Sequence, residues 1–124
     1  GDRGELLLVE TSCFSAPEGF VRTLGRIMSA GYHPVIAHPE RYMYVRDISG
    51  YRKWLDAGAR FQLNLLSLGG HYGPEARAKA RRLLERGYYT YAGSDLHGLR
   101  HAGLLRGLRL TKKEQTHLYK IIQK

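Results

Sequence analysis

The sequence has a single cysteine, no long hydrophobic run and few acidic residues. Cys13 cannot form a disulfide within the chain, which excludes a disulfide scaffold and favours a reducing, cytoplasmic location. No apolar run approaches the ~20 residues of a membrane span, and no charged-then-apolar leader opens the chain, so we expect no membrane insertion. The chain has 11 Asp and Glu residues and 20 Lys and Arg residues, and the resulting formal charge of +9 favours anionic partners.

The 124 residues suit one small globular domain, because 43% are hydrophobic and 25% are charged. Short apolar runs predict strands at 5–9, 33–37, 60–64 and 88–92, the first of them buried. Longer amphipathic stretches between and after these runs predict helices. Strands that alternate with helices indicate β-α units, so the predicted fold class is α/β with a parallel sheet.

Three helix starts are marked by capping residues. Ser15 with Glu18, and Thr111 with Glu114, have the S/T-x-x-E spacing of a capping box. Asp47 is expected to cap a helix that ends at residue 58. A further helix is predicted over 74–86, and the chain is expected to end in a helix.

Polar side chains of types that can bind metals follow three of the four predicted strands. Glu10 follows the first, His38 the second, and Asp95 and His97 the fourth, whereas the third ends in Asn64, a weak ligand. The carboxyl ends of parallel strands lie on one side of a sheet, so these four side chains are expected to line one cavity. Carboxylate and imidazole together suit Zn, Mn or Fe, which polarise a phosphoryl oxygen and generate a hydroxide nucleophile.

Each residue also has a simpler explanation. Glu10 would cap a helix at a βα turn, His38 would be a turn residue before Pro39, and Asp95 would form an Asx-turn with His97 two residues on. Their joint appearance at successive strand ends favours a shared metal site over three separate explanations.

Arg41 follows the His-Pro-Glu triplet and has two interpretations of equal weight: it binds a phosphate, or it forms a salt bridge with Glu40 or another loop carboxylate. Cys13 is not expected to be a nucleophile, because no neighbouring base accompanies it and the C-x₅-R loop of cysteine-dependent phosphatases is absent. The remaining histidines are expected to be structural or on the surface: His33, His71, His101 and His117.

Four strings together carry a family resemblance: LLVE at 7–10, VIAHPERY at 35–42, QLN at 62–64 and GSDLH at 93–97. In order and spacing they resemble the bacterial PHP-type tyrosine-protein phosphatases of capsular and exopolysaccharide biosynthesis. The resemblance implies a (β/α)₇ barrel with up to three divalent metals, typically manganese, at its C-terminal face. It also implies that the substrate is the phosphotyrosine-containing tail of the autokinase that controls polysaccharide polymerisation.

The resemblance also implies roles for individual residues. Glu10 and His38 would share one metal, Asp95 would ligate a second and His97 a third. Arg41 would contact the substrate phosphate, so that His38 and Arg41 would be the catalytic residues. Metal-activated hydroxide would hydrolyse the phosphomonoester in line, without a covalent phosphoenzyme.

The sequence departs from the family in lacking an H-x-H motif. Family members begin with a strand that carries this motif, and about the first three β-α units are not represented here. Residues 1–124 are therefore expected to be the C-terminal part of a PHP domain, an incomplete barrel as an isolated chain. Uncovered sheet edges predict self-association, and the activity of such a fragment stays an open question.

Two alternatives remain beside a tyrosine phosphatase. One is a PHP-type phosphatase that acts on a small phosphate ester. The other is an inactive basic fragment that binds polyanions, favoured by the +9 charge and the run RAKARRLLER at 77–86. Specific nucleic-acid binding is not expected, because no RRM, KH or zinc-finger pattern is present.

Overall fold

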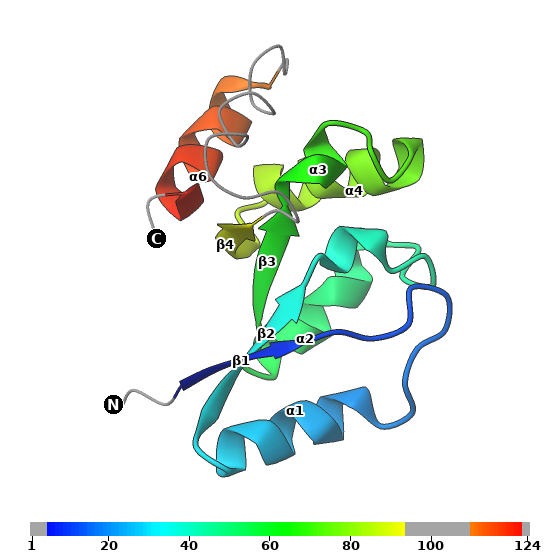
Figure 1. Cartoon of the computed structure of the whole chain (residues 1–124), viewed down its shortest axis with the longest axis vertical. Helices are drawn as coiled ribbons and strands as arrows, with labels where there is room; N and C mark the ends of the chain where they lie inside the picture. The colour runs from blue at the N-terminus through cyan, green and yellow to red at the C-terminus, as the bar shows by residue number, and fades with distance from the viewer. Residues whose placement is uncertain (1–4, 94–109, 123–124) are drawn as a thin grey trace.

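The computed structural model describes residues 5–93 and 110–122. Four parallel strands form one sheet in the order β1-β2-β3-β4, as Figure 1 shows. The strands are β1 (Glu5–Val9), β2 (Tyr32–Ala37), β3 (Arg60–Asn64) and β4 (Tyr89–Gly93). The α-helices are α1 (Phe20–Ser29), α2 (Arg52–Asp56), α3 (Leu65–Leu68), α4 (Pro74–Glu85) and α6 (Lys112–Ile122), and two 3₁₀ turns, η1 (Pro39–Arg41) and η2 (Ile48–Tyr51), lie between β2 and α2. The predicted α/β class with a parallel sheet is confirmed.

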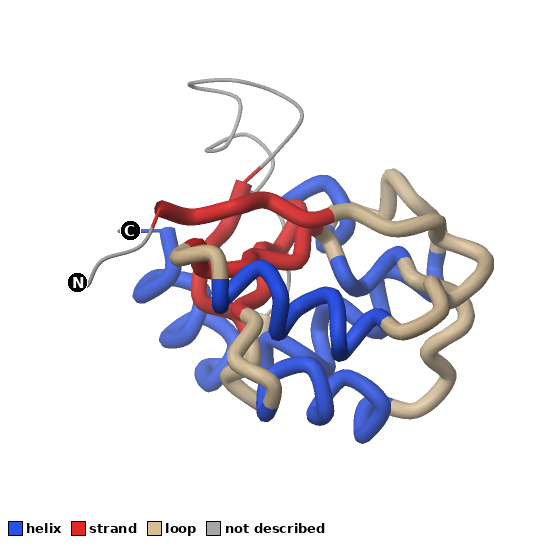
Figure 2. The backbone as a smooth tube through the Cα atoms, turned by 90° about the horizontal axis from the view of Figure 1, so that it is seen from below, coloured by secondary structure: helices blue, strands red, loops and turns tan. Residues whose placement is uncertain are grey.

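The hydrophobic core lies between the sheet and the helices that gather along one side of the strands (Figure 2). Ile36, Phe61 and Leu63 point from β2 and β3 into this core and are fully buried. Trp54 of α2 lies at its centre, with edge-to-face contacts to Phe20 at 5.1 Å, to Tyr51 at 5.6 Å and to Phe61 at 6.4 Å between ring centroids. Each such aromatic pair contributes about 0.5–1.5 kcal/mol beyond the area that it buries.

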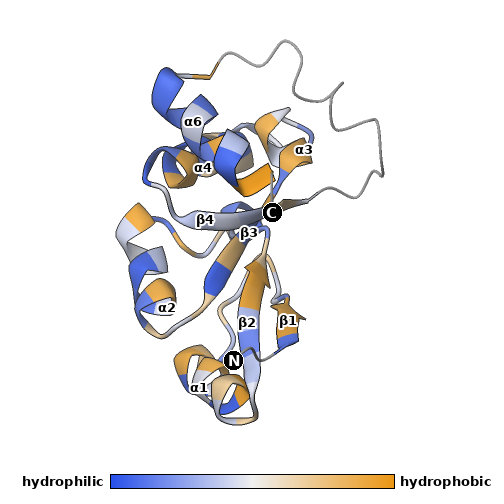
Figure 3. Cartoon of the chain, turned by 90° about the vertical axis from the view of Figure 1, so that its left-hand side faces the viewer, coloured by the Kyte–Doolittle hydropathy of each residue, from blue (hydrophilic) through white to orange (hydrophobic). Residues whose placement is uncertain are grey.

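The prediction that the first strand is buried is wrong. Leu6 and Leu8 are each 55% exposed, and apolar colour continues along β1 at the edge of the sheet in Figure 3. Within the described part of the chain β1 pairs with β2 alone, and most of the helices gather along the opposite face of the sheet (Figure 2). A run of apolar residues indicates burial only where both faces of the strand are covered.

One of the two predicted capping boxes forms. The Thr111 backbone N–H donates to Glu114 Oε1 at 2.8 Å, and the Glu114 N–H donates to Thr111 Oγ1 at 3.1 Å, a reciprocal pair that starts α6. The box at Ser15 and Glu18 is wrong, because α1 begins only after Gly19, whose left-handed backbone (φ 67°) caps it without a side chain. The S/T-x-x-E spacing occurs at both places. At Ser15 the path of the loop after β1 delays the start of the helix until Gly19, so no capping box forms there.

Asp47 caps its helix as predicted, since its Oδ1 accepts a hydrogen bond from the Ser49 N–H at 3.2 Å. The helix itself is in two pieces, with η2 running directly into α2. The sequence did not predict α3, because four residues are too few for a helical period to show. No helix among residues 5–93 and 110–122 is long and apolar enough to cross a membrane.

Candidate metal centre

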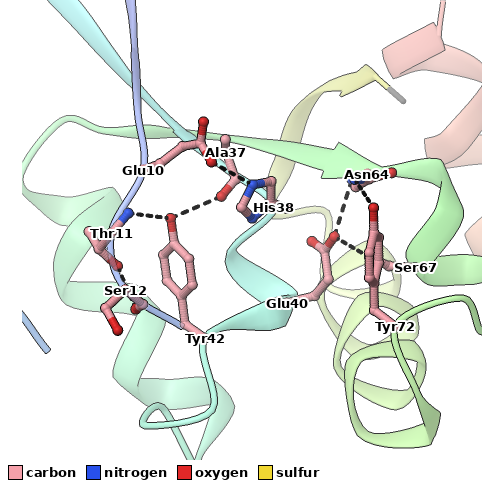
Figure 4. Close-up of polar contacts among 10 residues, drawn as sticks. All are labelled: Glu10, Thr11, Ser12, Ala37, His38, Glu40, Tyr42, Asn64, Ser67 and Tyr72. Carbon is pink, nitrogen blue, oxygen red and sulfur yellow. Dashed lines mark hydrogen bonds and ion pairs between the residues drawn. The ribbon is translucent and has the colours of Figure 1, made fainter. Parts of the chain in front are cut away.

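The ends of the neighbouring strands β1 and β2 bring together two of the predicted ligands. Val9 is the register partner of Ile36, so Glu10 and His38 leave the sheet side by side. His38 Nε2 lies 3.0 Å from Glu10 Oε1, a contact drawn in Figure 4. Glu10 remains 62% exposed while the His38 side chain is 17% exposed, so the pair lies at the surface of the C-terminal end of the sheet.

His38 has an unusual backbone. Its φ of 36° and ψ of 58° are left-handed, and among the described residues it alone has a positive φ without being a glycine. Its N–H donates to Gln62 O on β3 at 2.8 Å, and its carbonyl accepts from the Arg41 N–H of η1 at 3.0 Å. A left-handed non-glycine residue costs of the order of 1–3 kcal/mol, a strain that concentrates at functional sites.

The imidazole of His38 fits a metal ligand. Nε2 faces a carboxylate, whereas Nδ1 is buried without a hydrogen-bond partner in the described structure. An unsatisfied buried nitrogen is rare, and a bound ion or an ordered water is a group that satisfies such an atom. Imidazole and carboxylate are also the donors that Zn, Mn and Fe accept.

Two donors are fewer than a closed metal site needs. No group of three or more His, Cys, Asp or Glu side chains arranged for a metal occurs in the two described ranges. Asp95 and His97, the other two predicted ligands, lie outside the described residues. The metal role of all four residues therefore stays a prediction, for which the described strands provide one adjacent pair.

The sequence did not identify Glu40 as the buried centre of this region. Its carboxylate is fully buried and accepts hydrogen bonds from Ser67 Oγ at 2.6 Å, Tyr89 OH at 2.7 Å and the Asn64 N–H at 3.2 Å. Burial raises the pKa of Glu40, and the bonds from Ser67 and Tyr89 act against that rise. Glu40 thus joins η1, which follows His38, to the carboxyl end of β3 and to α3, as Figure 4 shows. Through Tyr89 it is also joined to β4.

Two stacked tyrosines form the wall beside His38. Tyr42 and Tyr44 have ring centroids 5.8 Å apart, and Tyr42 meets the His38 ring edge-on at 6.1 Å. Tyr42 OH accepts from the Thr11 N–H at 3.3 Å and donates to Ala37 O at 3.0 Å, while Thr11 Oγ1 lies 2.9 Å from Tyr44 OH. Burial raises the pKa of Tyr42 to about 12, so its phenol stays neutral. The wall fixes the loop after Glu10 against the loop after His38.

Arg41 lies over an aromatic ring. Its guanidinium carbon is 3.8 Å from the centre of the Tyr72 ring, and Tyr72 OH accepts from Asn64 Nδ2 at 3.4 Å. The described structure contains no ion pair between Arg41 and Glu40, because the Glu40 carboxylate faces Ser67 and Tyr89 instead. A cation–π contact occupies the face of a guanidinium and leaves its N–H edge available.

The remaining candidates have structural positions. Asn64 Oδ1 accepts from the Leu66 N–H at 3.0 Å and caps α3. Cys13 is half-buried and its carbonyl accepts from the Met43 N–H at 2.7 Å. Of the other histidines, His71 is exposed, His33 and His117 are half-buried, and His101 lies outside the described residues.

Comparison with known proteins supplies the family. The model of the family described as capsular polysaccharide synthesis, CpsB/CapC, matches residues 2–120. The chain belongs to the CpsB/CapC family. The predicted resemblance to capsule-biosynthesis phosphatases is thereby confirmed.

Two relatives add detail. The tyrosine-protein phosphatase YwqE of Bacillus subtilis is 37% identical over 71 residues, which are 56% of this chain and 28% of YwqE. A solved structure from work on YwqE and on CpsB of Streptococcus pneumoniae, described as unique metal-dependent tyrosine phosphatases, matches with a TM-score of 0.71 and 25% identity. That match covers 92% of this chain and 50% of the solved chain, so this CpsB/CapC chain spans about half the length of its structural relative.

Proposed function

We propose that this chain provides part of the active site of a metal-dependent protein-tyrosine phosphatase that regulates capsular or exopolysaccharide biosynthesis. One observation carries the proposal: Glu10 and His38 lie 3.0 Å apart at adjacent strand ends, and His38 has a second, buried nitrogen without a partner in the described structure. The chain that presents them belongs to the CpsB/CapC family, and its relatives YwqE and CpsB are metal-dependent tyrosine phosphatases. The substrate would be the phosphotyrosine-containing tail of the autokinase.

Glu10 and His38 would hold one divalent ion, with manganese as the expected metal. Asp95 and His97, outside the described residues, would supply further donors to the cluster. A bound divalent metal supplies Lewis-acid polarisation of the phosphoryl oxygen and a nucleophile derived from water.

The side chains around the pair would position the substrate. The Tyr72 ring holds Arg41 by one face, so its N–H edge is free to bind two oxygens of a phosphate. Tyr42, a neutral phenol engaged with Thr11 and Ala37, would keep the His38 imidazole oriented from the side. In this interpretation Arg41 would bind the phosphate, and His38 would be a ligand of the divalent ion.

Hydrolysis of a phosphotyrosine peptide with added manganese tests the proposal. His38→Asn removes the imidazole but keeps a residue that tolerates the left-handed backbone, and we expect it to lower kcat/KM at least about 100-fold. His71→Asn is the matched control, because His71 is exposed. Arg41→Lys should raise KM for the peptide, since a lysine cannot make the bidentate contact.

The same assay separates the alternatives. A sugar phosphate hydrolysed faster than the phosphopeptide would replace the protein substrate by a small ester. Folded protein that hydrolyses neither compound, also when it is combined with the N-terminal barrel units of a family member, would contradict the phosphatase proposal. Activity that survives both His38→Asn and a chelator would contradict the metal assignment.

We also infer that residues 1–124 correspond to the C-terminal part of a PHP barrel and that an isolated chain associates with a second copy. The inward face carries the exposed Leu6 and Leu8 beside a hollow of about 300 Å³, which Tyr91 and Ile121 of α6 also line. In the described sheet the outer edge of β1 is unpaired. Half of a closed barrel leaves such a face and edge for another half to cover. Sedimentation equilibrium should give a dimer, and Leu8→Lys should give a monomer. A wild-type chain that remains monomeric at about 100 μM would contradict this inference.

A further inference from the structure

A second cavity lies outside the Glu10–His38 pair. It measures about 580 Å³ and is bounded by the loop after β1, the start of α1, and the segment from Tyr44 to α2. Its apolar walls come from Phe20, Tyr44, Val45 and Trp54. We call this cavity the Trp54 pocket. Its volume is in the range of ordinary ligand pockets, and it is large enough for one or two apolar side chains.

The lining of the Trp54 pocket carries three cationic side chains, Arg22, Arg46 and Lys53. All three residues are exposed, and in the described structure none of them forms an ion pair. The one carboxylate in the lining, Asp47, accepts the hydrogen bond that caps η2. Apolar walls with uncompensated positive charge fit a ligand that is apolar at its centre and anionic around it.

The Trp54 pocket is connected to the candidate metal centre. Tyr44 lines the pocket and stacks on Tyr42, whose ring in turn meets the ring of His38. These two ring contacts, of 5.8 and 6.1 Å, place the Tyr44 ring within about 12 Å of the His38 ring, and an extended peptide covers that distance in about four residues. Because Tyr42 is fully buried, a peptide that reaches both places has to run over the surface around it.

A peptide fits this pocket better than a nucleic acid does. Nucleic-acid bases bind through stacking on free aromatic faces. Trp54 is only 3% exposed, and its ring is surrounded by Phe20, Tyr51 and Phe61 at edge-to-face distances. The pocket is a partly apolar hollow, and an aliphatic side chain can bury its surface there without stacking on a ring.

We propose that the Trp54 pocket is an accessory subsite for an acidic peptide segment. An apolar side chain of the segment lies in the hollow against the half-buried Tyr44, and its flanking carboxylates meet Arg46 and Lys53. The segment belongs to the same peptide as the tyrosine phosphate that is hydrolysed, so the subsite selects phosphotyrosines in acidic sequence. This inference rests on the proposed phosphatase function for its biological role, but the binding event itself needs neither the metal nor the phosphate.

A binding experiment without phosphate tests the subsite on the whole chain. The probe is a peptide of glutamates around one leucine, without tyrosine or phosphate, titrated by calorimetry and by the fluorescence of Trp54, the single tryptophan. Replacing the leucine by serine should weaken binding about ten-fold, because the apolar side chain no longer fills the pocket. The double variant Arg46→Gln/Lys53→Gln should weaken it at least about five-fold.

The control is Arg26→Gln/Arg86→Gln, which removes the same charge at exposed positions outside the lining and should leave the affinity within about two-fold. The proposal is overturned if the peptide does not bind at 1 mM, or if both double variants weaken it equally. It is also overturned if an oligonucleotide of equal charge binds as tightly and loses affinity through the same two residues. His38→Asn, or a chelator, should abolish hydrolysis without changing this affinity, so failure of the phosphatase proposal and failure of the subsite are distinguishable.

Discussion

The hydroxyl of Tyr89 donates a 2.7 Å hydrogen bond to Glu40 Oε1 across 49 residues of sequence. Both residues are buried, and Ser67 donates to the other carboxylate oxygen at 2.6 Å. The bonds tie η1, directly after His38, to α3 and β4. A buried carboxylate with its oxygens occupied thus holds together the end of the sheet where the candidate metal centre lies.

Removing either donor should weaken the fold measurably. We expect Tyr89→Phe and Ser67→Ala each to lower the free energy of unfolding by about 1–2 kcal/mol, because each leaves Glu40 with one hydrogen bond fewer in a buried place. Urea unfolding measures both values. Tyr119→Phe is the matched control, since Tyr119 is 66% exposed. Effects no larger than that of the control would mean that the Glu40 network contributes little to stability.

His38→Gly should separate stability from metal binding. Glycine adopts φ 36° without strain, so the free energy of unfolding should stay unchanged or rise by up to about 1 kcal/mol, while manganese binding is lost. Thermal unfolding and calorimetric titration with manganese, on the same samples, provide the two readouts. A variant that unfolds much more easily would show that the imidazole is a packing residue above all.

Two glycine substitutions should change the free energy of unfolding in opposite directions. Gly58 has φ 103°, and a Cβ there would lie 2.7 Å from the Met28 side chain, so Gly58→Ala should destabilise by about 1–3 kcal/mol. Gly25 lies within α1, where an added Cβ would meet nothing within 4 Å, so Gly25→Ala should stabilise by about 0.5–1 kcal/mol. Chemical denaturation of both variants beside the parent chain gives the comparison. Equal effects would contradict the assigned backbone geometry.

Glu114 should make stability depend on pH in the acid range. Burial alone would raise the pKa of Glu114, but hydrogen bonds from Arg81 and Thr111, together with the Arg81 charge, leave it below the usual 4.5. Because the folded-state pKa is depressed, the stabilisation is complete above the unfolded pKa and is lost as the pH falls through the folded pKa. The free energy of unfolding should therefore decline below about pH 4.5, by at most about 1.4 kcal/mol per pH unit from this group.

Comparison of variants isolates this dependence. Glu114→Gln should flatten the curve of unfolding free energy against pH between 3 and 5 and lower its plateau at neutral pH by about 1–2 kcal/mol. Glu85→Gln, at an exposed position, should leave the curve unchanged. An unaltered slope in Glu114→Gln would assign the acid sensitivity to other carboxylates.

The sequence predicted the strands and most helices because their patterns are local. All four strands have their expected places within about a residue, and α4 (Pro74–Glu85) occupies the range predicted for it, 74–86. The predictions that were wrong depend on contacts between residues that are distant in sequence. The exposure of β1 reflects which elements cover it, and the start of α1 reflects the path of the preceding loop, neither of which is encoded in a short window.

The candidate site shows the same division. The order of strands and their parallel direction were sufficient to bring Glu10 near His38. The role of Glu40 was not predictable, because its three donors come from α3, β3 and β4 and nothing in the string HPER marks a buried carboxylate. The cation–π contact of Arg41 with Tyr72 likewise depends on the loop between α3 and α4, which carries Tyr72.

The position of Glu40 bears on how the protein would exchange its ions. At the carboxyl end of the sheet, the Glu40 carboxylate accepts hydrogen bonds from Ser67 and Tyr89, and these bonds do not involve a cation. Loading and unloading would then leave the folded chain intact, and a chelator would act as a reversible inhibitor with little effect on the melting temperature. Under the proposed function, metal-free protein would remain folded and would bind the ion again when it is returned.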